Sequence, residues 1–199
     1  MEAIALVDGN NFYASCEQII NPGLRKKPIV ILSNNDGCII ARSPEARLLR
    51  IKMGVPYFKI KDRLSHLGVI VLSSNYSLYG DISKRFMNLL ERYSERIEIY
   101  SIDEAFVLIK RPQNKDLHPW ARQLRSFIYQ NLGLTITIGI AENKVKAKLA
   151  NRLAKRISNS AGIFDLGNIE KKNDCSQEIS VNNIWGIGGK TSNWLRNKG

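Results

Sequence analysis

Two adjacent carboxylates, Asp103 and Glu104, lie between two short β-favouring runs, Ile97–Ile99 and Phe106–Ile109. Such runs joined by a brief polar stretch predict a β-hairpin, with both acidic residues at or beside its turn. In a straight strand the two side chains would point to opposite faces, whereas at a bend both can reach one site. Carboxylates among apolar residues are costly to bury unless they are paired or metal-bound, and they suit Mg²⁺. The alternative is an exposed turn that happens to be acidic.

A third carboxylate, Asp8, ends the apolar run Ile4–Val7, which is typical of a buried strand. After the turn residues 9–11, a helix is expected from Phe12 to Ile20. Asp8 would then face a helix N-terminus, whose free backbone N–H groups suit phosphate. A carboxylate for a metal beside donors for phosphate is the arrangement that metal-nucleotide chemistry requires. Alternatively, Asp8 or Asn10 simply caps the helix.

The chain is strongly basic, with 30 Lys and Arg against 18 Asp and Glu and a net charge of +12 in 199 residues. This excess favours a polyanionic partner, most often nucleic acid. An anionic membrane surface is the rival, but no basic helix carries an aromatic face and no run approaches the roughly 18 apolar residues of a membrane span. Three widely spaced cysteines fit neither a disulfide framework nor a zinc site and indicate a reducing cytosol: Cys16, Cys38 and Cys175.

The segment Asn143–Arg156 predicts a basic helix whose apolar stripe is Val145, Leu149 and Leu153. Like charges four residues apart destabilise an isolated helix by about 0.2–0.5 kcal/mol for each pair. An anionic partner would relieve that repulsion, so DNA contacts are expected on this helix, at Lys144 and Lys148. The alternative is a basic face that is merely solvated.

Arg47 follows a helix start in which Ser43 is the expected N-cap and Pro44 the first helical residue. It lies about one turn into that helix, close enough to serve an anion near the helix start. Alternatively, Arg47 is an ordinary solvated helix residue.

Near the end of the chain, two short helical pieces flank Gly186-Ile-Gly188, within residues 181–195. This arrangement resembles a helix-hairpin-helix, whose glycine amides approach a phosphate backbone without reading bases. We therefore expect DNA contacts at Gly186 and Gly188, the alternative being a plain glycine turn.

Six segments in this order resemble the motifs of the Y-family translesion DNA polymerases, of the UmuC type found in bacterial polymerase V. Each motif is weak alone, but six in the right order are highly specific and extend along nearly the whole chain. They are Val7–Ala14, Leu32–Arg42, Ser74–Tyr79, Ile97–Phe106, Asn143–Ala150 and Trp185–Gly188.

The resemblance implies an α+β fold with a palm sheet flanked by helices, a small fingers domain and the start of a helical thumb. The palm is expected at residues 1–10 and 75–166, and the fingers at residues 11–74. Residues 167–199 would begin the thumb and carry the helix-hairpin-helix. The little-finger domain of the family is expected to be absent, either because the chain is a fragment or because it is naturally short.

The resemblance also implies a two-metal site. In the family, the positions that match Asp8, Asp103 and Glu104 hold two Mg²⁺ ions, and the backbone carbonyl at Gly9 also coordinates. The catalytic residues implied are therefore the same three carboxylates.

For the incoming nucleotide, Tyr13 matches the steric gate, whose ring occupies the space that a ribose 2′-hydroxyl would need. Arg47 and Lys155 match residues that grip the triphosphate, and the amides of Phe12 and Tyr13 would add neutral donors. Two positions depart from many family members, which have a hydroxyl residue and a tyrosine at Ala41 and Pro44.

The function implied is template-directed DNA synthesis across damaged DNA in the SOS response, by two-metal-ion nucleotidyl transfer. Its partners would be primer–template DNA and dNTPs, with a UmuD-type accessory protein, a recombinase filament and a sliding clamp, in a cytoplasmic, nucleoid-associated setting. The main alternative is a truncated, non-catalytic DNA-binding or assembly module that retains the polymerase face. A palm-type nucleotide cyclase would leave Tyr13, the basic helix and residues 185–188 without a purpose.

Overall fold

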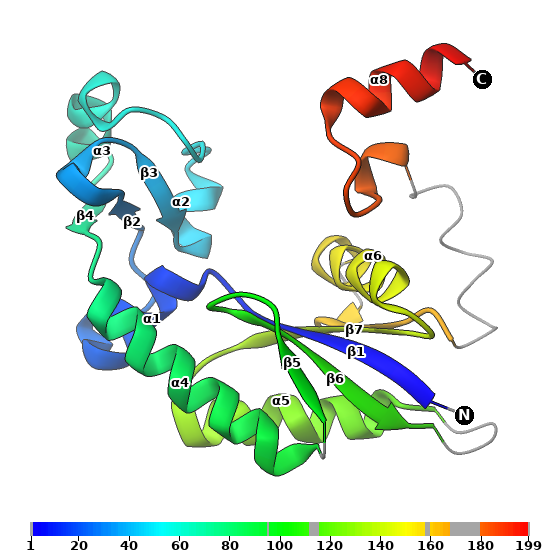
Figure 1. Cartoon of the computed structure of the whole chain (residues 1–199). Coiled ribbons are helices and arrows are strands. Elements are labelled where there is room, and N and C mark those ends of the chain that lie inside the picture. The colour runs from blue at the N-terminus through cyan, green and yellow to red at the C-terminus, as the bar shows by residue number, and fades with distance from the viewer. Residues whose placement is uncertain (1, 95, 112–115, 158–159, 168–179, 199) are drawn as a thin grey trace. The chain divides into compact units, whose positions relative to one another are not determined.

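The computed structural model describes residues 2–94, 96–111, 116–157, 160–167 and 180–198 (Figure 1). Cys175 and the first part of the expected thumb lie outside these residues. The chain forms two compact units. We call them the five-stranded unit (Met1–Asp8, Met87–Asn131 and Thr135–Gly199) and the three-stranded unit (Gly9–Phe86 and Leu132–Leu134).

The five-stranded unit is built on a mixed sheet in the order β5-β6-β1-β7-β8. β1 pairs antiparallel with β6, β6 pairs antiparallel with β5, and β7 pairs parallel with β8. Helices α5 and α6 lie on opposite faces of this sheet (Figure 1). Its elements are β1 (Glu2–Gly9), β5 (Ile97–Ile99), β6 (Glu104–Lys110), α5 (His118–Leu132), β7 (Ile136–Ala141), α6 (Lys144–Arg156), β8 (Ile163–Asp165), the 3₁₀ turn η6 (Val181–Asn183) and α8 (Gly189–Lys198).

The three-stranded unit has the sheet order β3-β2-β4, with β2 antiparallel to β3 and parallel to β4. Its apolar core includes Val30, Leu32 and Leu64. Helix α4 (Tyr76–Tyr93) has residues in both units. The other elements are α1 (Phe12–Ile20), η1 (Pro22–Leu24), β2 (Ile29–Leu32), η2 (Asn34–Asp36), β3 (Ile39–Arg42), α2 (Pro44–Leu48), η3 (Tyr57–Lys59), α3 (Lys61–His66) and β4 (Ile70–Ser73).

The hairpin predicted around the adjacent carboxylates is confirmed. Ile97 pairs with Val107 across β5 and β6, Asp103 lies in the turn, and Glu104 is the first residue of β6. The backbone N–H of Tyr100 donates to the carbonyl of Glu104 at 3.0 Å, which closes the turn. Asp103 therefore lies where the strand direction reverses, and Glu104 follows it as the first residue of β6.

The predicted apolar stripe of helix α6 is wrong at Val145, whose residue is 44% exposed. The buried side of α6 consists mainly of small residues, with Ala147, Ala150 and Asn151 against the sheet. The reason is Gly139 in β7, where an added Cβ would lie 2.1 Å from the backbone nitrogen of Asn151. Because the helix backbone lies directly on Gly139, the helix residues on either side of that contact include the small Ala147 and Ala150.

The predicted α+β class is confirmed. The structure also confirms the helix start at Ser43, whose hydroxyl accepts a hydrogen bond from the N–H of Ala46 at 3.3 Å, with Pro44 following as the first helical residue. In the described residues, no helix has the length and apolar character needed to cross a membrane. The thumb and its helix-hairpin-helix remain predictions.

Candidate active site

Asp8 and Glu104 are directly opposite one another on the antiparallel strands β1 and β6. Opposite residues project from the same face of a sheet, and residues two apart along a strand share that face. The two carboxylates therefore share a face with Leu6 and Phe106, which belong to the core packed under α6. Two like charges at directly opposite positions destabilise a sheet unless something offsets them.

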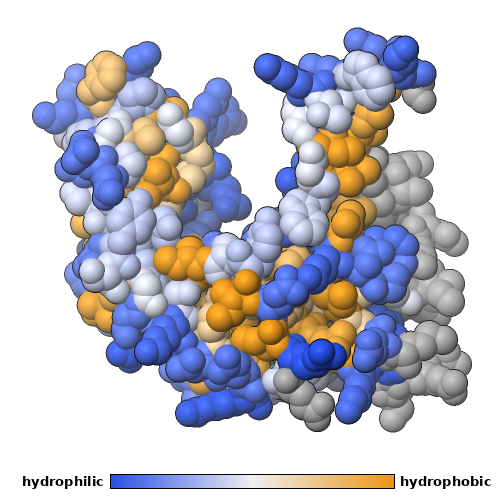
Figure 2. All heavy atoms as spheres, viewed as in Figure 1, coloured by the Kyte–Doolittle hydropathy of each residue, from blue (hydrophilic) through white to orange (hydrophobic). Residues whose placement is uncertain are grey.

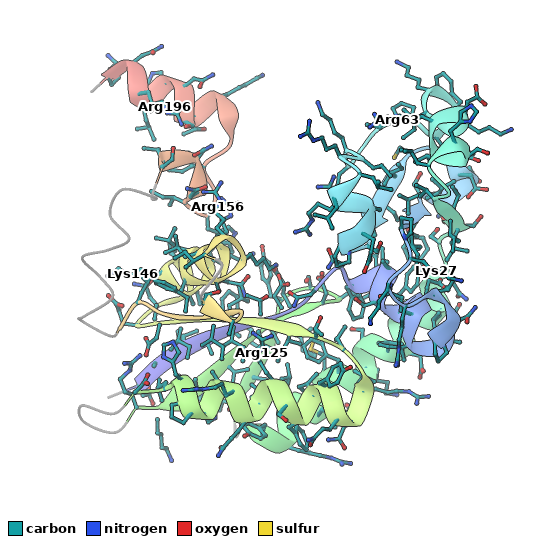
Figure 3. The ribbon with its side chains drawn as sticks, turned by 180° about the vertical axis from the view of Figure 1, so that it is seen from behind. Lys27, Arg63, Arg125, Lys146, Arg156 and Arg196 are labelled. Atoms are coloured by element: carbon teal, nitrogen blue, oxygen red, sulfur yellow. The ribbon has the colours of Figure 1, made fainter. Side chains whose placement is uncertain are left out.

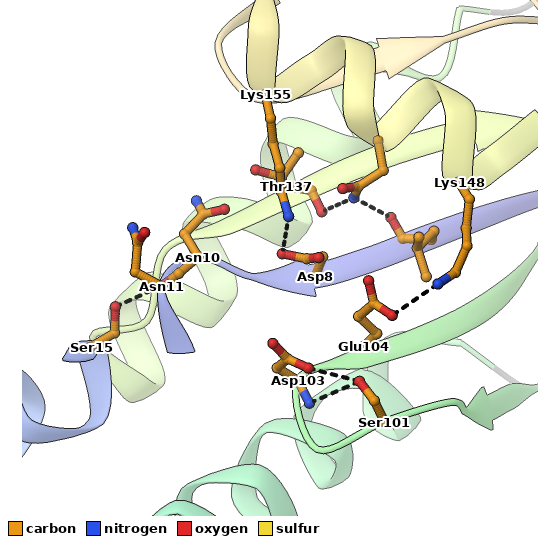
Figure 4. Close-up of polar contacts among 12 residues, drawn as sticks. Asp8, Asn10, Asn11, Ser15, Ser101, Asp103, Glu104, Thr137, Lys148 and Lys155 are labelled. Atoms are coloured by element: carbon orange, nitrogen blue, oxygen red, sulfur yellow. Dashed lines mark hydrogen bonds and ion pairs between the residues drawn. The ribbon is translucent and has the colours of Figure 1, made fainter. Parts of the chain in front are cut away.

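Two lysines of α6 offset those charges (Figure 4). Lys155 Nζ lies 2.6 Å from Oδ1 of Asp8, and Lys148 Nζ lies 3.2 Å from Oε2 of Glu104. Asp8 is only 6% exposed, so its ion pair is shielded from solvent on the carboxylate side. The sheet supplies two carboxyl groups and the helix supplies two ammonium groups, all within the five-stranded unit.

Asn151 fixes helix α6 above the sheet. Its Nδ2 donates to the backbone carbonyl of Leu6 at 3.3 Å and to that of Thr137 at 3.1 Å, so it joins α6 to β1 and β7. Lys148 lies three residues before Asn151 and Lys155 four residues after it, spacings that share one face of a helix. Asn151 therefore sets where both ammonium groups lie. The sequence motifs did not indicate Asn151, although its position between the two lysines is visible in the sequence.

Burial raises the pKa of the Asp8 carboxyl from its ordinary value of 3.8 to about 7. The ammonium of Lys155 opposes this by lowering the pKa, whereas Glu104 raises it further through its charge and hydrogen bonding. Near neutral pH the carboxyl is thus poised between its two protonation states. A cation brought to this carboxyl would favour the charged form.

Asp103 lies in the turn between β5 and β6, where its Oδ1 accepts a hydrogen bond from Ser101 Oγ at 2.7 Å. Figure 4 shows Asp103 beside Glu104 at the end of the hairpin. Among the residues that the structure describes, no group of three His, Cys, Asp or Glu side chains forms a ready-made metal cluster. The structure thus pairs Asp8 with Glu104 across two strands. It holds Asp103 in the neighbouring turn through the hydrogen bond from Ser101.

A cavity of about 180 Å³ lies beside the carboxylates. It has room for several water molecules and is lined by groups of both charges. Oxygen ligands next to water-sized space are what Mg²⁺ requires, because it keeps several waters when it binds protein carboxylates. The residues present therefore fit this ion. The lining residues are Leu6, Asp8, Glu104, Lys148, Asn151, Arg152, Lys155, Asn183 and Trp185.

In the three-stranded unit, Tyr13 is part of a tyrosine cluster. Its ring stacks on that of Tyr79 with centroids 4.4 Å apart and an interplanar angle of 15°, and Tyr76 meets both rings edge-on. Tyr79 is fully buried, and its hydroxyl donates to Oε1 of Glu17 at 2.9 Å. Burial also raises the pKa of the Tyr79 hydroxyl. The Tyr13 ring therefore stacks on a neighbour that is itself fixed in place, a contact that the sequence motifs did not predict.

The N-cap of α1 is neither Asp8 nor Asn10, the two residues that the sequence offered as alternative caps. The N-cap is Asn11, in the left-handed region at φ 48°, and the Asn11 side chain makes no capping hydrogen bond. Asp8 pairs with Lys155 instead. The side-chain oxygen of Asn11 accepts a hydrogen bond from Arg47 Nη2 at 2.8 Å, so Arg47 reaches the beginning of this helix. Phe12, the first residue of α1, is buried.

Close packing by the residues that the structure describes does not explain the two glycines expected to contact DNA. A Cβ added at Gly186 or Gly188 would meet nothing within 4 Å. Gly186 has φ +85°, which favours glycine for backbone reasons, whereas Gly188 is not among the positive-φ residues. Lys144 is paired, since its Nζ lies 2.5 Å from Oε2 of Glu98, and both side chains remain exposed.

The positive charge is spread over both units. Basic residues on several elements are shown in Figure 3: Lys27, Arg63, Arg125, Lys146, Arg156 and Arg196. The molecule also exposes apolar residues among its hydrophilic ones (Figure 2). A spread of this kind suits contacts with phosphates better than the reading of a base sequence.

The chain matches the impB/mucB/samB family over residues 7–152, a span that contains all three carboxylates and the Lys148–Glu104 pair. The chain belongs to the impB/mucB/samB family. A curated member, UmuC of Salmonella typhimurium, is 46% identical over 193 residues, which cover 96% of this chain and 46% of UmuC. DNA polymerase IV of Saccharolobus solfataricus is 32% identical over 203 residues, covering 98% of this chain and 56% of that polymerase. The resemblance to Y-family polymerases is therefore confirmed.

Solved structures agree with this assignment to the impB/mucB/samB family. The insertion ternary complex of Dbh DNA polymerase superimposes with a TM-score of 0.83 at 27% identity, covering 99% of this chain and 58% of Dbh. DinB from Sulfolobus solfataricus gives a TM-score of 0.79 at 27% identity, covering 98% and 57%. The chain spans about half the length of the curated UmuC-type relatives that it matches.

Proposed function

We propose that this chain carries the catalytic centre of a translesion DNA polymerase, which extends a primer with dNTPs opposite a damaged template. The observation that supports this most directly is the pairing of Asp8 with Glu104 across two strands, under two lysines of one helix. Membership of a family with polymerase-named relatives supports the reaction class. In this proposal the palm comprises residues 1–10 and 75–166, the fingers 11–74, and the thumb begins at 167.

The metal site in this proposal consists of Asp8, Asp103 and Glu104, with the backbone carbonyl of Gly9. Two Mg²⁺ ions bound there would supply Lewis-acid activation of the primer 3′-hydroxyl and stabilise the departing pyrophosphate. The chain's own contribution is to hold carboxylates on facing strand positions and to keep their charges compensated before a metal arrives. Lys155 and Lys148 perform that compensation.

Nucleotide binding is assigned to other side chains. Arg47 and Lys155 would bind the triphosphate, and the backbone amides of Phe12 and Tyr13 would donate to it. The Tyr13 ring would exclude a ribose 2′-hydroxyl, and its stacking on Tyr79 supports that role because a fixed ring excludes better than a mobile one.

DNA binding in this proposal is independent of sequence. The net charge of +12 supports it, together with Gly188, which neither positive φ nor packing among the described residues explains. The residues assigned are Lys144, Lys148, Gly186 and Gly188, although Lys148 is largely enclosed and faces Glu104. We also propose that the chain works near the nucleoid with a UmuD-type protein, a recombinase filament and a sliding clamp, as the family resemblance implies.

Primer extension with Asp103→Ala tests the proposed reaction. Removing one metal ligand should abolish nearly all incorporation, since that ligand supports transition-state stabilisation worth several kcal/mol. DNA binding and the fold should be retained, because Asp103 is a turn residue bonded to Ser101. Glu98→Gln is the matched control, because it removes an exposed carboxylate from the same hairpin. If the folded, DNA-bound wild-type chain incorporates nothing in a single turnover with saturating Mg²⁺, the non-catalytic binding module is correct instead.

A further inference from the structure

Lys148 shares its ammonium group between a carboxylate and two aromatic rings. Its Nζ lies 3.2 Å from Oε2 of Glu104, 4.1 Å from the ring centroid of Tyr100 and 5.0 Å from that of Trp185. Both ring distances are inside the roughly 6 Å within which a ring face attracts a cation. The Lys148 side chain is 18% exposed, so water screens these attractions only in part.

The neighbouring pair, Lys155 and Asp8, is different. Its Nζ–Oδ1 distance is 2.6 Å, and in the described part of the chain no aromatic ring shares this ammonium. Charge-assisted N–H···O bonds are usually about 2.7–2.9 Å long, so the 3.2 Å contact of Lys148 with Glu104 is a loose one. Lys148 is thus held less tightly by its carboxylate than Lys155 is, and the two rings give the Lys148 ammonium a second interaction.

The two rings come from different parts of the five-stranded unit. Tyr100 belongs to the hairpin that carries Glu104, whereas Trp185 belongs to the segment Ser180–Lys198. The rings meet edge-on, with centroids 5.5 Å apart and an interplanar angle of 90°. A second contact of the segment is the hydrogen bond from Arg152 Nη1 to the carbonyl of Asn182 at 3.0 Å. Trp185 therefore links this segment to the ammonium that holds Glu104.

We propose that Trp185 is a positioning residue for Glu104 and acts on it through Lys148. This inference rests on the proposed role of Glu104 as a metal ligand. A divalent cation that takes Glu104 must displace the Lys148 ammonium from it. Trp185 and Tyr100 already attract that ammonium in the metal-free chain. Once it leaves the carboxylate it can move closer to the rings, and the gain in attraction lowers the cost of its release. Packing of the segment Ser180–Lys198 against Tyr100 and Lys148 then favours metal binding at Glu104. Metal binding favours this packing in turn, since such coupling is reciprocal.

Binding of Mn²⁺, a spectroscopic substitute for Mg²⁺, tests this in the full chain without DNA or nucleotide. Followed by electron paramagnetic resonance, Trp185→Leu should weaken Mn²⁺ binding by about twofold to thirtyfold, the range that loss of one cation–π contact allows. Trp185→Phe, which keeps a ring, should recover part of the loss. Lys148→Met should instead tighten binding, because it removes the competing cation. Trp194→Leu is the matched control, since Trp194 is 60% exposed in the same segment.

A double-mutant cycle separates action through Lys148 from a general structural effect. In the Lys148→Met background, Trp185→Leu should leave the Mn²⁺ affinity unchanged. An equal weakening in both backgrounds would overturn the proposal, and so would equal effects of Trp185→Leu and Trp194→Leu. Glu104→Gln tests the underlying site separately: Mn²⁺ binding that survives this change would overturn the proposed metal role of Glu104 itself.

Discussion

The ammonium of Lys155 lies 2.6 Å from Oδ1 of Asp8, so a residue assigned to the triphosphate holds a residue assigned to the metal. Asp8 is nearly inaccessible, whereas the Lys155 side chain is 41% exposed. Because the ammonium lowers the pKa of a carboxyl that burial raises, this contact keeps Asp8 closer to its charged form. Because the Lys155 side chain is partly exposed, it can turn toward a phosphate once another cation binds Asp8.

Lys155→Met should shift the pH dependence of incorporation. Without the ammonium, the pKa of Asp8 should rise above its value of about 7, because burial and Glu104 then act unopposed. Incorporation should therefore fall more at pH 7 than at pH 9, with the acid limb of the profile displaced to higher pH. Single-turnover rates between pH 6 and 9.5 measure this. Lys146→Met, at an exposed residue of the same helix, is the control, and an equal loss at every pH would show that only phosphate contact was removed.

Asp8→Asn should stabilise the metal-free fold above neutral pH. The carboxyl has a pKa of about 7 in the folded chain, raised mainly by burial, against an ordinary value of 3.8 in the unfolded chain. Between these values the folded state holds a proton that the unfolded state has lost, so stability falls as pH rises through this window. The difference corresponds to at most about 4 kcal/mol.

The measurement is urea unfolding of wild type and Asp8→Asn in EDTA at pH 5 and pH 8. The variant should be more stable at pH 8, and the gap should shrink at pH 5. Mg²⁺ should narrow the gap at pH 8, because a metal that binds only the folded wild type stabilises it. A gap that is the same at both pH values would contradict the proposed titration of Asp8.

The local sequence was sufficient for the elements that hold the carboxylates. Alternating and continuous apolar runs predicted β1 and the hairpin, and the structure places Asp103 in the turn and Glu104 at the start of β6. What no local pattern contains is the pairing of β1 with β6, which brings Asp8 opposite Glu104 across about 95 residues of chain. Only the family resemblance predicted that Asp8 lies near the hairpin carboxylates. The pairing of β1 with β6 is the physical reason for it.

The apolar stripe predicted for α6 is right at Leu153, which is buried, and wrong at Val145. Leucine and valine spacing favoured Val145 as inward, yet the helix presents alanines because Gly139 brings the strand backbone against it. That choice depends on a residue outside the helix, so helical periodicity alone could not reveal it. The same close approach places Asn151 where its amide reaches strand carbonyls, and thereby turns Lys148 inward.

Asn151→Ala should lower both stability and activity. The two hydrogen bonds to the carbonyls of Leu6 and Thr137 would be lost in a buried position, at a cost of about 1–3 kcal/mol. Because α6 would lose its fixed register, the two lysines should hold their carboxylates less well, and the incorporation rate should fall even where the protein remains folded. Thermal unfolding and single-turnover assays measure the two effects. Asn131→Ala is a matched control, since Asn131 donates to a helix carbonyl at an exposed site, and equal effects of both variants would contradict the role of Asn151.

Tyr13→Ala should admit ribonucleotides much more readily, because the proposed discrimination is steric exclusion of one hydroxyl. Tyr79→Leu should relax the selection partly, since it removes the ring on which Tyr13 stacks at 4.4 Å, and Tyr79→Phe should preserve it. The ratio of rNTP to dNTP incorporation is the measurement, with Tyr129→Ala as an exposed control. An unchanged ratio for Tyr13→Ala would mean that Tyr13 is only a packed aromatic at a helix start.

Gly188→Ala should weaken binding of primer–template DNA without disturbing the fold. An added methyl group at this position meets nothing in the described chain, and Gly188 is not among the positive-φ residues, so alanine introduces neither a clash nor strain. Any loss of affinity must then come from the partner, as expected if DNA phosphates approach the Gly188 backbone closely. Gly80→Ala in α4 is the matched control, since its methyl group also enters open space.

The salt dependence of DNA binding distinguishes the proposed contact at the Gly188 backbone from an ionic contact. Binding of the wild type should weaken steeply as salt rises, because the charge of +12 releases counterions from DNA. Lys144→Ala should reduce the slope of log affinity against log salt by about 1, as the loss of one phosphate contact requires. Gly188→Ala should lower the affinity at every salt concentration and leave that slope unchanged, since a backbone amide carries no charge. Unaltered affinity in Gly188→Ala would mean that residues 186–188 form a plain glycine turn.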